Sequence, residues 1–282
     1  VRAGKGQGLR VPGGVREGGG MTSPVIIGNA TLYLGDCLEL MRDIPDGSVD
    51  MILCDLPYGT TACKWDTVIP FEPLWAQYRR VAKRNAAIVL TASQPFTTAL
   101  IASNMREFKY CWIWEKERPS NFFAAKFQPL NNTEDVIVFS RGGCNNGTKN
   151  PMPYNPQGLV SIDRVAKNCN TGGMIGQAHK TSLNDGRLYH QTTTGYPKKS
   201  IKFNADGGLH PTQKPVALME YLIRTYTQEG ETVLDNCMGS GTTGVAAMNL
   251  QREFIGIERE PKYFDIACRR IEDAQRKSRM FT

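Results

Sequence analysis

A glycine-rich loop lies late in this chain of 282 residues and restricts how the rest can fold. The run 232–235 is typical of a buried strand, and the sequence GSGTTG from Gly239 to Gly244 has the G-x-G-x-x-G spacing of a ligand-binding turn that opens a helix. Only 38 residues follow Gly244, too few for the further strands of a doubly wound sheet. The rest of the sheet must therefore come from the N-terminal half, which predicts a circularly permuted strand order.

The N-terminal half has the alternation of strands and helices that this interpretation requires. Hydrophobic periodicity predicts strands at 30–36, 49–55 and 86–92, with helices at 37–44 and 73–82 between them. Further strands are expected at 109–116, 135–141, 232–235 and 253–258, and further helices at 95–104, 216–227 and 241–250. This pattern predicts an α/β fold, a doubly wound mixed sheet with helices on both faces.

Positive charge is concentrated in one segment of the chain. The formal net charge is +7, and the segment 141–202 alone carries nine lysines and arginines against two aspartates. This segment is rich in Gly, Asn, Thr and Pro and shows little periodicity. In isolation it is equally well explained as a solvated insertion, but its place within a periodic α/β pattern favours an irregular insertion that faces nucleic acid.

The composition also bears on location. The eight cysteines form no C-x-x-C pair, which indicates reduced thiols and no structural zinc. No apolar run approaches the roughly 18 residues that a membrane span needs, and the glycine-rich start lacks the apolar region of a secretory signal. We therefore expect a cytoplasmic protein that does not associate with a membrane.

Acidic residues at two strand ends indicate a nucleotide-like cofactor. Asp235 ends the strand before the loop, and Glu258 ends the next strand, 19 residues after Gly239, where an acid accepts hydrogen bonds from ribose hydroxyls. The order of strand, acid, loop, helix, strand and second acid is more specific than the loop alone. A dinucleotide is one candidate, and the structural alternative is a glycine turn required only for helix packing.

The strand 49–55 ends on the unusual turn Asp55-Leu56-Pro57-Tyr58. Taken alone, this turn is explained by Asp55 capping it and Tyr58 lying half-buried in the core. Ligands of open α/β sheets, however, bind at the carboxyl ends of strands, which is where this turn lies. The turn is therefore a candidate part of a binding site.

Three motifs together resemble one family. The sequence DLPY at 55–58 resembles the D-P-P-Y motif of amino-group DNA methyltransferases, and LDNCMGSG at 234–241 resembles their S-adenosylmethionine loop. HPTQKP at 210–215 resembles the element that precedes this loop in the beta-order class, whose order is catalytic motif, recognition region, cofactor loop. The resemblance covers about residues 28–275 apart from a divergent middle.

The resemblance implies a site-specific transfer of a methyl group from S-adenosylmethionine to an amino group of a flipped base in double-stranded DNA. Asp55 and the carbonyl of Leu56 would accept the two N–H groups of the amine, Pro57 would stiffen the turn, and Tyr58 would stack on the base. Leu56 replaces the usual proline, which keeps the carbonyl acceptor but removes the rigidity of one ring. An acid at position 55 favours N6 of adenine, with N4 of cytosine as the alternative.

The resemblance also implies a set of cofactor-binding residues. These are Asp36, His210, Thr212, Lys214, Asp235, Gly239, Gly241, Thr242 and Glu258. Asp36 would either reach the adenine of the cofactor or cap the helix that follows it. Lys214 would either help close the methionine side or be a surface charge. The transfer needs no metal.

Two aromatic segments require separate interpretation. Trp112 and Trp114 alternate with their neighbours as in a strand, which favours core packing over base stacking. The segment Asn121-Phe122-Phe123, followed by Lys126 and Phe127, is expected to be exposed and is a candidate for the flipped-base pocket or a phosphate contact.

The predicted organisation has four parts. They are a flexible glycine-rich extension at 1–20, a catalytic part at 21–140, a basic target-recognition insertion at 141–205 and a cofactor-binding part at 206–282. Base specificity would come from major-groove contacts of the insertion. We expect a stand-alone methyltransferase, with monomer and homodimer both open. Two competitors are a catalytically silent binding protein, disfavoured by the intact motifs, and an NAD-dependent oxidoreductase, disfavoured by the late loop.

Overall fold

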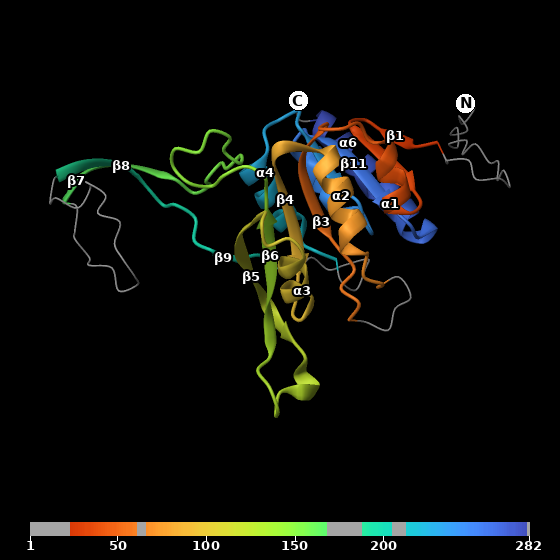
Figure 1. Ribbon diagram of the computed structural model, residues 1–282, viewed down its shortest axis with the longest axis horizontal. Helices are drawn as coiled ribbons and strands as arrows, with labels where there is room; N and C mark the ends of the chain where they lie inside the picture. The colour runs from red at the N-terminus through yellow and green to blue at the C-terminus, as the bar shows by residue number, and fades with distance from the viewer. Residues whose placement is uncertain (1–22, 61–65, 168–187, 205–212, 281–282) are drawn as a thin grey trace, which may run out of the picture.

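The computed structural model describes residues 23–60, 66–167, 188–204 and 213–280. Within these residues one mixed sheet forms the centre of the molecule, in the order β1-β2-β11-β10-β3-β4-β6-β5-β9 (Figure 1). Its strands are β1 (Val25–Ile27), β2 (Ala30–Leu34), β11 (Glu253–Glu258), β10 (Thr232–Asp235), β3 (Val49–Asp55), β4 (Ala82–Ala92), β6 (Asn131–Phe139), β5 (Phe108–Ser120) and β9 (Ser200–Lys202).

The permuted order predicted from the late glycine loop is confirmed. Strand β10 lies parallel to β3, with Val233 beside Met51 and Leu234 beside Ile52. Strands β2, β11, β10, β3 and β4 run parallel to one another, whereas β6 is antiparallel to both β4 and β5. The strand before the glycine loop and the strand before the DLPY turn are therefore neighbours, although about 180 residues separate them in the chain.

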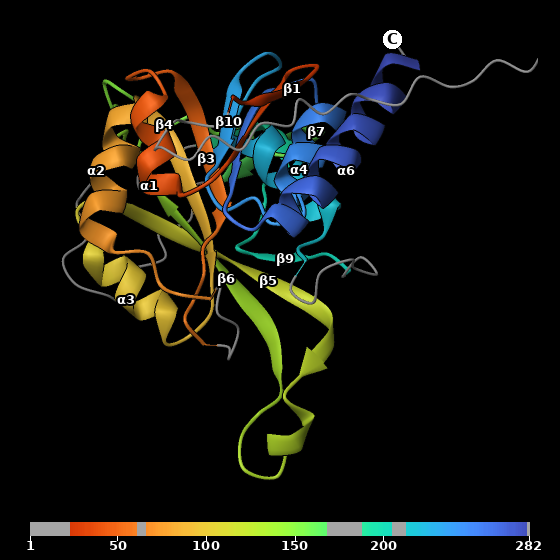
Figure 2. The same cartoon turned by 90° about the vertical axis from the view of Figure 1, so that its right-hand side faces the viewer.

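Helices cover both faces of the sheet (Figure 2). One face carries α1 (Cys37–Leu40), the 3₁₀ turn η1 (Met41–Asp43), α2 (Phe71–Val81) and α3 (Phe96–Ser103), and the other carries α4 (Val216–Tyr226), α5 (Thr242–Asn249) and α6 (Pro261–Met280). Strand β3 contributes to both cores, because Met51 and Leu53 pack on the second face and Ile52 and Cys54 on the first. Burial on two sides explains the apolar run at 51–54.

Helix α6 was not among the predicted elements. It is 20 residues long and polar over most of its surface, but Phe264, Ala267, Ile271 and Ala274 form one buried stripe at spacings of three and four. This narrow stripe packs on the face that α4 and α5 also cover. The sequence does contain apolar residues at helical spacing, but they form only one narrow stripe and so gave a weak signal.

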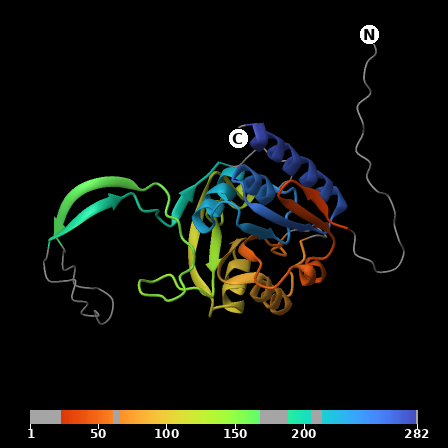
Figure 3. The same ribbon diagram turned by 90° about the horizontal axis from the view of Figure 1, so that it is seen from above.

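The basic insertion is less irregular than predicted. Strands β7 (Val160–Lys167) and β8 (Leu188–Thr194) pair as an antiparallel ribbon that extends away from the sheet (Figure 3). Val160, Val165 and Leu188 are exposed, so neither face of the ribbon has the buried alternation by which a strand is recognised. The insertion also returns to the sheet, because β9 pairs in parallel with β5.

A second projection is formed by β5 and β6. Their pairing continues as far as Ser120 and Asn131, and the loop between them includes the 3₁₀ turn η2 (Phe122–Ala124). Figures 1 and 2 show this β5–β6 hairpin protruding well beyond the sheet. Among the described residues, no helix combines the length and the apolar character needed to cross a membrane.

Candidate active site

One cavity of about 540 Å³ lies at the carboxyl ends of the parallel strands. Its wall includes most of the predicted site residues, namely Asp36, Asp55, Leu56, Pro57, Tyr58, Lys214, Asp235, Gly239, Thr242 and Glu258. Gly241 lies just outside the wall, while His210 and Thr212 fall outside the described residues. The permuted sheet therefore brings the DLPY turn and the glycine loop to a single cavity.

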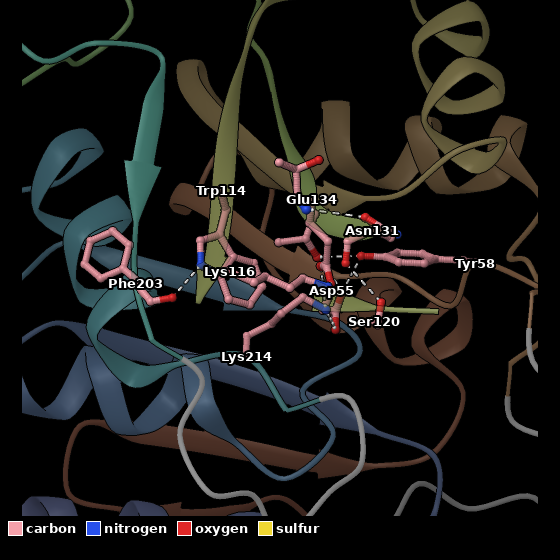
Figure 4. A network of polar contacts seen from close by, with 11 residues as sticks. Asp55, Tyr58, Trp114, Lys116, Ser120, Asn131, Glu134, Phe203 and Lys214 are labelled. Carbon is pink, nitrogen blue, oxygen red and sulfur yellow. Dashed lines mark hydrogen bonds and ion pairs between the residues drawn. The ribbon is translucent and has the colours of Figure 1, made fainter. Parts of the chain in front are cut away.

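The carboxylate of Asp55 is held by three side chains from different parts of the chain (Figure 4). The Tyr58 hydroxyl donates to Oδ1 at 2.8 Å, and the Thr91 hydroxyl donates to the same oxygen. Lys214 Nζ donates to Oδ2 at 2.7 Å. Thr91 is the neighbour of Asp55 across the β3–β4 ladder, so sheet pairing fixes this contact. Both carboxylate oxygens thus have donors that fix their orientation.

Lys214 is buried between two acids, which shows that the surface-charge alternative is wrong. Its side chain is 6% exposed, and Nζ lies 2.7 Å from Asp55 and 3.3 Å from Glu134 Oε2. Burial lowers the pKa of Lys214, but the two carboxylates outweigh that effect and raise it above its ordinary value. Glu134, on β6, pairs in addition with Lys116 on β5. The ammonium group of Lys214 therefore stays charged beside Asp55.

The ring of Tyr58 contacts an aromatic side chain and a cation. It stacks on Phe96 with 5.1 Å between ring centroids and 24° between planes, and Lys214 Nζ lies 5.6 Å from its centroid. Burial, with Asp55 nearby, holds the pKa of the Tyr58 hydroxyl well above its usual range. The hydroxyl is therefore a neutral donor. Tyr58 is partly buried, as the structural alternative predicts, and it also lines the cavity, as a binding role requires.

Two further acids of the cavity wall contact the backbone that follows β10. Glu258 Oε2 accepts the N–H of Gly239 at 2.8 Å, and Asp235 Oδ1 accepts the N–H of Cys237 at 3.1 Å. Burial raises the pKa of Asp235 to about 7, and it also raises that of Glu258. An acid that burial makes reluctant to ionise is suited to a cationic ligand, which would restore its charge.

The glycines of the loop serve different purposes. A Cβ at Gly241 would lie 2.8 Å from Cβ of Ala267 on α6, and one at Gly244 would lie 2.5 Å from Cδ1 of Ile271, so both are required for helix packing. Gly239 has a positive φ of 50° and no atom within 4 Å of its Cβ position. The packing alternative therefore holds for two of the three glycines, whereas Gly239 leaves open space in the cavity wall.

The remaining candidates are placed as follows. Asp36 caps α1 by accepting the N–H groups of Leu38 at 2.8 Å and Glu39 at 3.2 Å, which confirms the capping alternative, and it also lines the cavity. Trp112 and Trp114 are buried, as core packing predicts, but Trp114 also lines the cavity, so the base-stacking alternative stays open for that residue. Their indole nitrogens donate to the Tyr226 hydroxyl at 2.7 Å and to the Phe203 carbonyl at 2.9 Å, respectively.

The phenylalanines of the β5–β6 hairpin do not line the cavity. Phe122, Phe123 and Phe127 are 65%, 91% and 90% exposed, as expected, but they lie at the hairpin tip. The flipped-base-pocket interpretation of these residues is wrong for that reason. The sequence did not single out Thr91 and Glu134 as site residues. Their only signal was that each is a polar residue near an apolar stretch of its strand.

A permuted doubly wound sheet with an acid–proline–tyrosine turn and a glycine loop at one cavity defines an α/β group-transfer enzyme with a nucleotide-like cofactor. A family model described as DNA methylase, of the N6/N4 methyltransferases, matches residues 49–269. The chain belongs to this family, and is an S-adenosylmethionine-dependent DNA methyltransferase. This membership argues against the oxidoreductase alternative.

Individual relatives agree with the family. The chain is 29% identical to the type II methyltransferase M2.LlaDCHI of Lactococcus lactis subsp. cremoris, over 86% of this chain and 89% of the relative. It is 26% identical to the type II methyltransferase M2.MboI of Moraxella bovis, over 87% and 88% of the two chains.

Solved structures agree with the fold. The complex of M1.HpyAVI with S-adenosylmethionine superposes with a TM-score of 0.57 at 25% identity, covering 86% of this chain and 99% of that one. The PvuII DNA methyltransferase, described as cytosine-N4-specific, superposes with a TM-score of 0.59 at 16% identity, covering 89% and 93%. The second likeness supports the fold alone.

Proposed function

We propose that this protein methylates N6 of an adenine that has been flipped out of double-stranded DNA. The observation that carries the proposal is the position of Asp55, which shares a cavity with the glycine loop and is oriented by two hydroxyls and an ammonium group. Such a preorganised acceptor suits an amine that gains positive charge as it attacks. The acid at position 55, rather than a serine, supports adenine through the family resemblance.

S-adenosylmethionine, when bound, supplies the electrophilic methyl group. The residues that would hold it are Asp235, Gly239 and Glu258. They fit it because Gly239 leaves open space and because the two buried acids have raised pKa values that a cation would lower. Thr242 and Asp36 line the same cavity. His210 and Thr212 stay predictions.

The protein residues act on the target amine through hydrogen bonds. Asp55 would accept one N–H and the carbonyl of Leu56 the other, which lets the nitrogen become tetrahedral as it attacks. The incoming N–H would replace the Tyr58 hydroxyl at Oδ1, and the base would stack on the part of the Tyr58 ring that Phe96 leaves uncovered. Lys214 would remain on Oδ2 and keep the carboxylate oriented and ionised.

DNA binding by this site would involve the basic insertion, whose described part includes the β7–β8 ribbon. Its excess of positive charge suits the phosphate backbone, and base contacts from the same segment would set the recognised sequence. We expect the enzyme to act in the cytoplasm, where its two substrates are found.

The test is incubation with S-adenosylmethionine and unmethylated genomic DNA, followed by mass spectrometry of the nucleosides. We expect N6-methyladenine from the unaltered protein and none from Asp55→Ala, with Asp43→Ala, an exposed acid outside the cavity, as the matched control. Calorimetry should show that Asp55→Ala still binds the cofactor. N4-methylcytosine as the product would replace the adenine assignment, and the absence of any methylated base would refute the proposal.

A further inference from the structure

The tip of the β5–β6 hairpin presents three phenylalanine side chains to solvent. Phe123 and Phe127 are 91% and 90% exposed, and Phe122 is 65% exposed. Figure 2 shows that the tip is the part of the hairpin farthest from the sheet, so no other described element covers it. Three exposed phenylalanines within one six-residue turn are a candidate interaction site, because large exposed apolar patches are uncommon on a monomer.

The tip has a defined conformation that holds these rings apart from the protein core. Its 3₁₀ turn follows Asn121, which has a positive φ of 71°. Backbone hydrogen bonds run from Ala124 N to the Asn121 carbonyl at 3.1 Å and from Phe127 N to the Ala124 carbonyl at 2.8 Å. A hydrogen-bonded turn of this kind presents its side chains at low conformational cost when a partner binds.

The hairpin is continuous with the active site. Along its two strands, Lys116 and Ser120 on β5 and Glu134 on β6 line the cavity that holds Asp55 (Figure 4). A polymer whose base enters this cavity must therefore pass beside the hairpin that forms its wall.

The charge near the tip favours DNA as that polymer, although the whole hairpin, residues 108–139, carries four basic and four acidic side chains. From 118 to 133 the chain contains Arg118 and Lys126 and no acidic residue, and both of these cations are exposed. Positive charges beside exposed aromatic rings are the combination that binds a phosphate backbone while the rings stack on bases. A second copy of this chain would carry the same charges at the contact, which opposes pairing of two tips.

We propose that the tip is a wedge that inserts Phe123 and Phe127 into the base stack of the duplex next to the target adenine. Flipping a base leaves a gap in the stack and breaks one base pair, and apolar side chains of other DNA-bending proteins enter opened base steps in this manner. Arg118 and Lys126 would bind the flanking phosphates. This proposal rests on the proposed function and adds to it the group that stabilises the opened duplex.

The experiment compares two duplexes of one sequence, chosen after the methylated site has been identified on genomic DNA. In one the target adenine is paired, and in the other it faces an abasic position, so that no base pair needs to be broken. The protein carries Phe123→Ala and Phe127→Ala together, and Met105→Ala, which removes an exposed apolar side chain outside the hairpin, is the matched control. Methylation rates and the fluorescence of 2-aminopurine at the target position are measured for each.

We expect the double variant to methylate the paired duplex at least about tenfold more slowly, since stacking on one base contributes about 1–3 kcal/mol. On the abasic duplex its rate should lie within about twofold of the unaltered protein, because the wedge is no longer needed to keep the pair open. The 2-aminopurine signal should fall on the paired duplex only, and Met105→Ala should change neither rate.

Three results would overturn the wedge. They are an equal loss on both duplexes, no loss on either, and a shift of the double variant to a smaller oligomer in sedimentation, which would make the tip a contact between copies. These three results count against the wedge only if the unaltered protein methylates DNA in the same assay. An unaltered protein that makes no methylated base refutes the proposed function instead, so the two failures are distinguishable.

Discussion

The titration of Asp235 gives a quantitative prediction for cofactor binding. Asp235 is 2% exposed, and burial raises its pKa to about 7, so near neutral pH its carboxyl is partly protonated in the free protein. S-adenosylmethionine carries an ammonium and a sulfonium group. If these lie against Asp235, as proposed, binding favours the ionised carboxylate and releases the proton.

The size of the effect follows from the pKa. With a value of about 7, roughly 0.9 of the carboxyls are protonated at pH 6 and roughly 0.1 at pH 8. The cofactor should therefore bind about tenfold more tightly at pH 8 than at pH 6, with release of up to about 0.9 proton at pH 6. The free protein shows the opposite trend. Because folding raises the pKa of this carboxyl, the contribution of Asp235 to stability is fully present below the unfolded value of 3.8 and is lost as pH rises towards about 7.

Calorimetry at pH 6, 7 and 8 in two buffers of different ionisation enthalpy measures both the affinity and the protons released. Asp235→Asn removes the titrating group, so its affinity should lose most of this pH dependence. The same substitution should also stabilise the free protein more at pH 8 than at pH 5. The reasoning fails if Asp235→Asn and the unaltered protein have the same pH profile and release the same number of protons.

Three further predictions concern single side chains of the cavity. Lys214→Met breaks a buried ion pair and should destabilise the protein by about 3–5 kcal/mol in urea unfolding; an unchanged midpoint would mean that Asp55 does not depend on it. Gly241→Ala and Gly239→Ala both place a Cβ at a positive φ, +79° and +50°, but only at Gly241 does α6 lie too close. Gly241→Ala should therefore destabilise by about 1–3 kcal/mol and by more than Gly239→Ala, which should in addition weaken cofactor binding in calorimetry; equal stability losses would contradict these separate roles. Tyr58→Ala should lower kcat by about tenfold or more through lost stacking, and Tyr58→Phe by less, which steady-state methylation of DNA measures; the reverse ranking would show that the hydroxyl matters more than the ring.

The sequence was sufficient to predict a feature when that feature depends on the residues of a single strand or loop. The apolar run before Asp55 and the position of the glycine loop near the C-terminus predicted a permuted sheet, and β10 does lie beside β3. The contacts of Asp55 could not be predicted in the same way. Thr91 and Glu134 come from strands whose order in the sheet is a tertiary property, so no spacing in the chain places them beside the DLPY turn.

The β7–β8 ribbon and α6 were not predicted because most of their side chains are at least partly exposed to solvent. The β7–β8 ribbon has no buried face, and α6 has only a narrow one, so hydrophobic periodicity gave little signal for either. The burial of Lys214 was equally hidden, because lysine is a surface residue in most contexts, and only the two acids brought to it by β3 and β6 make its burial favourable.

The position of β10 and β11 has a consequence for how this protein is made. These two strands come from the last quarter of the chain, yet they lie between β2 and β3, which are almost consecutive in sequence. While the chain is still being synthesised, the facing edges of β2 and β3 remain unpaired and open to the wrong strands. The sheet can close only after β11 has left the ribosome. The last step of folding therefore also assembles the cavity, and the nascent chain has no complete active site before that step.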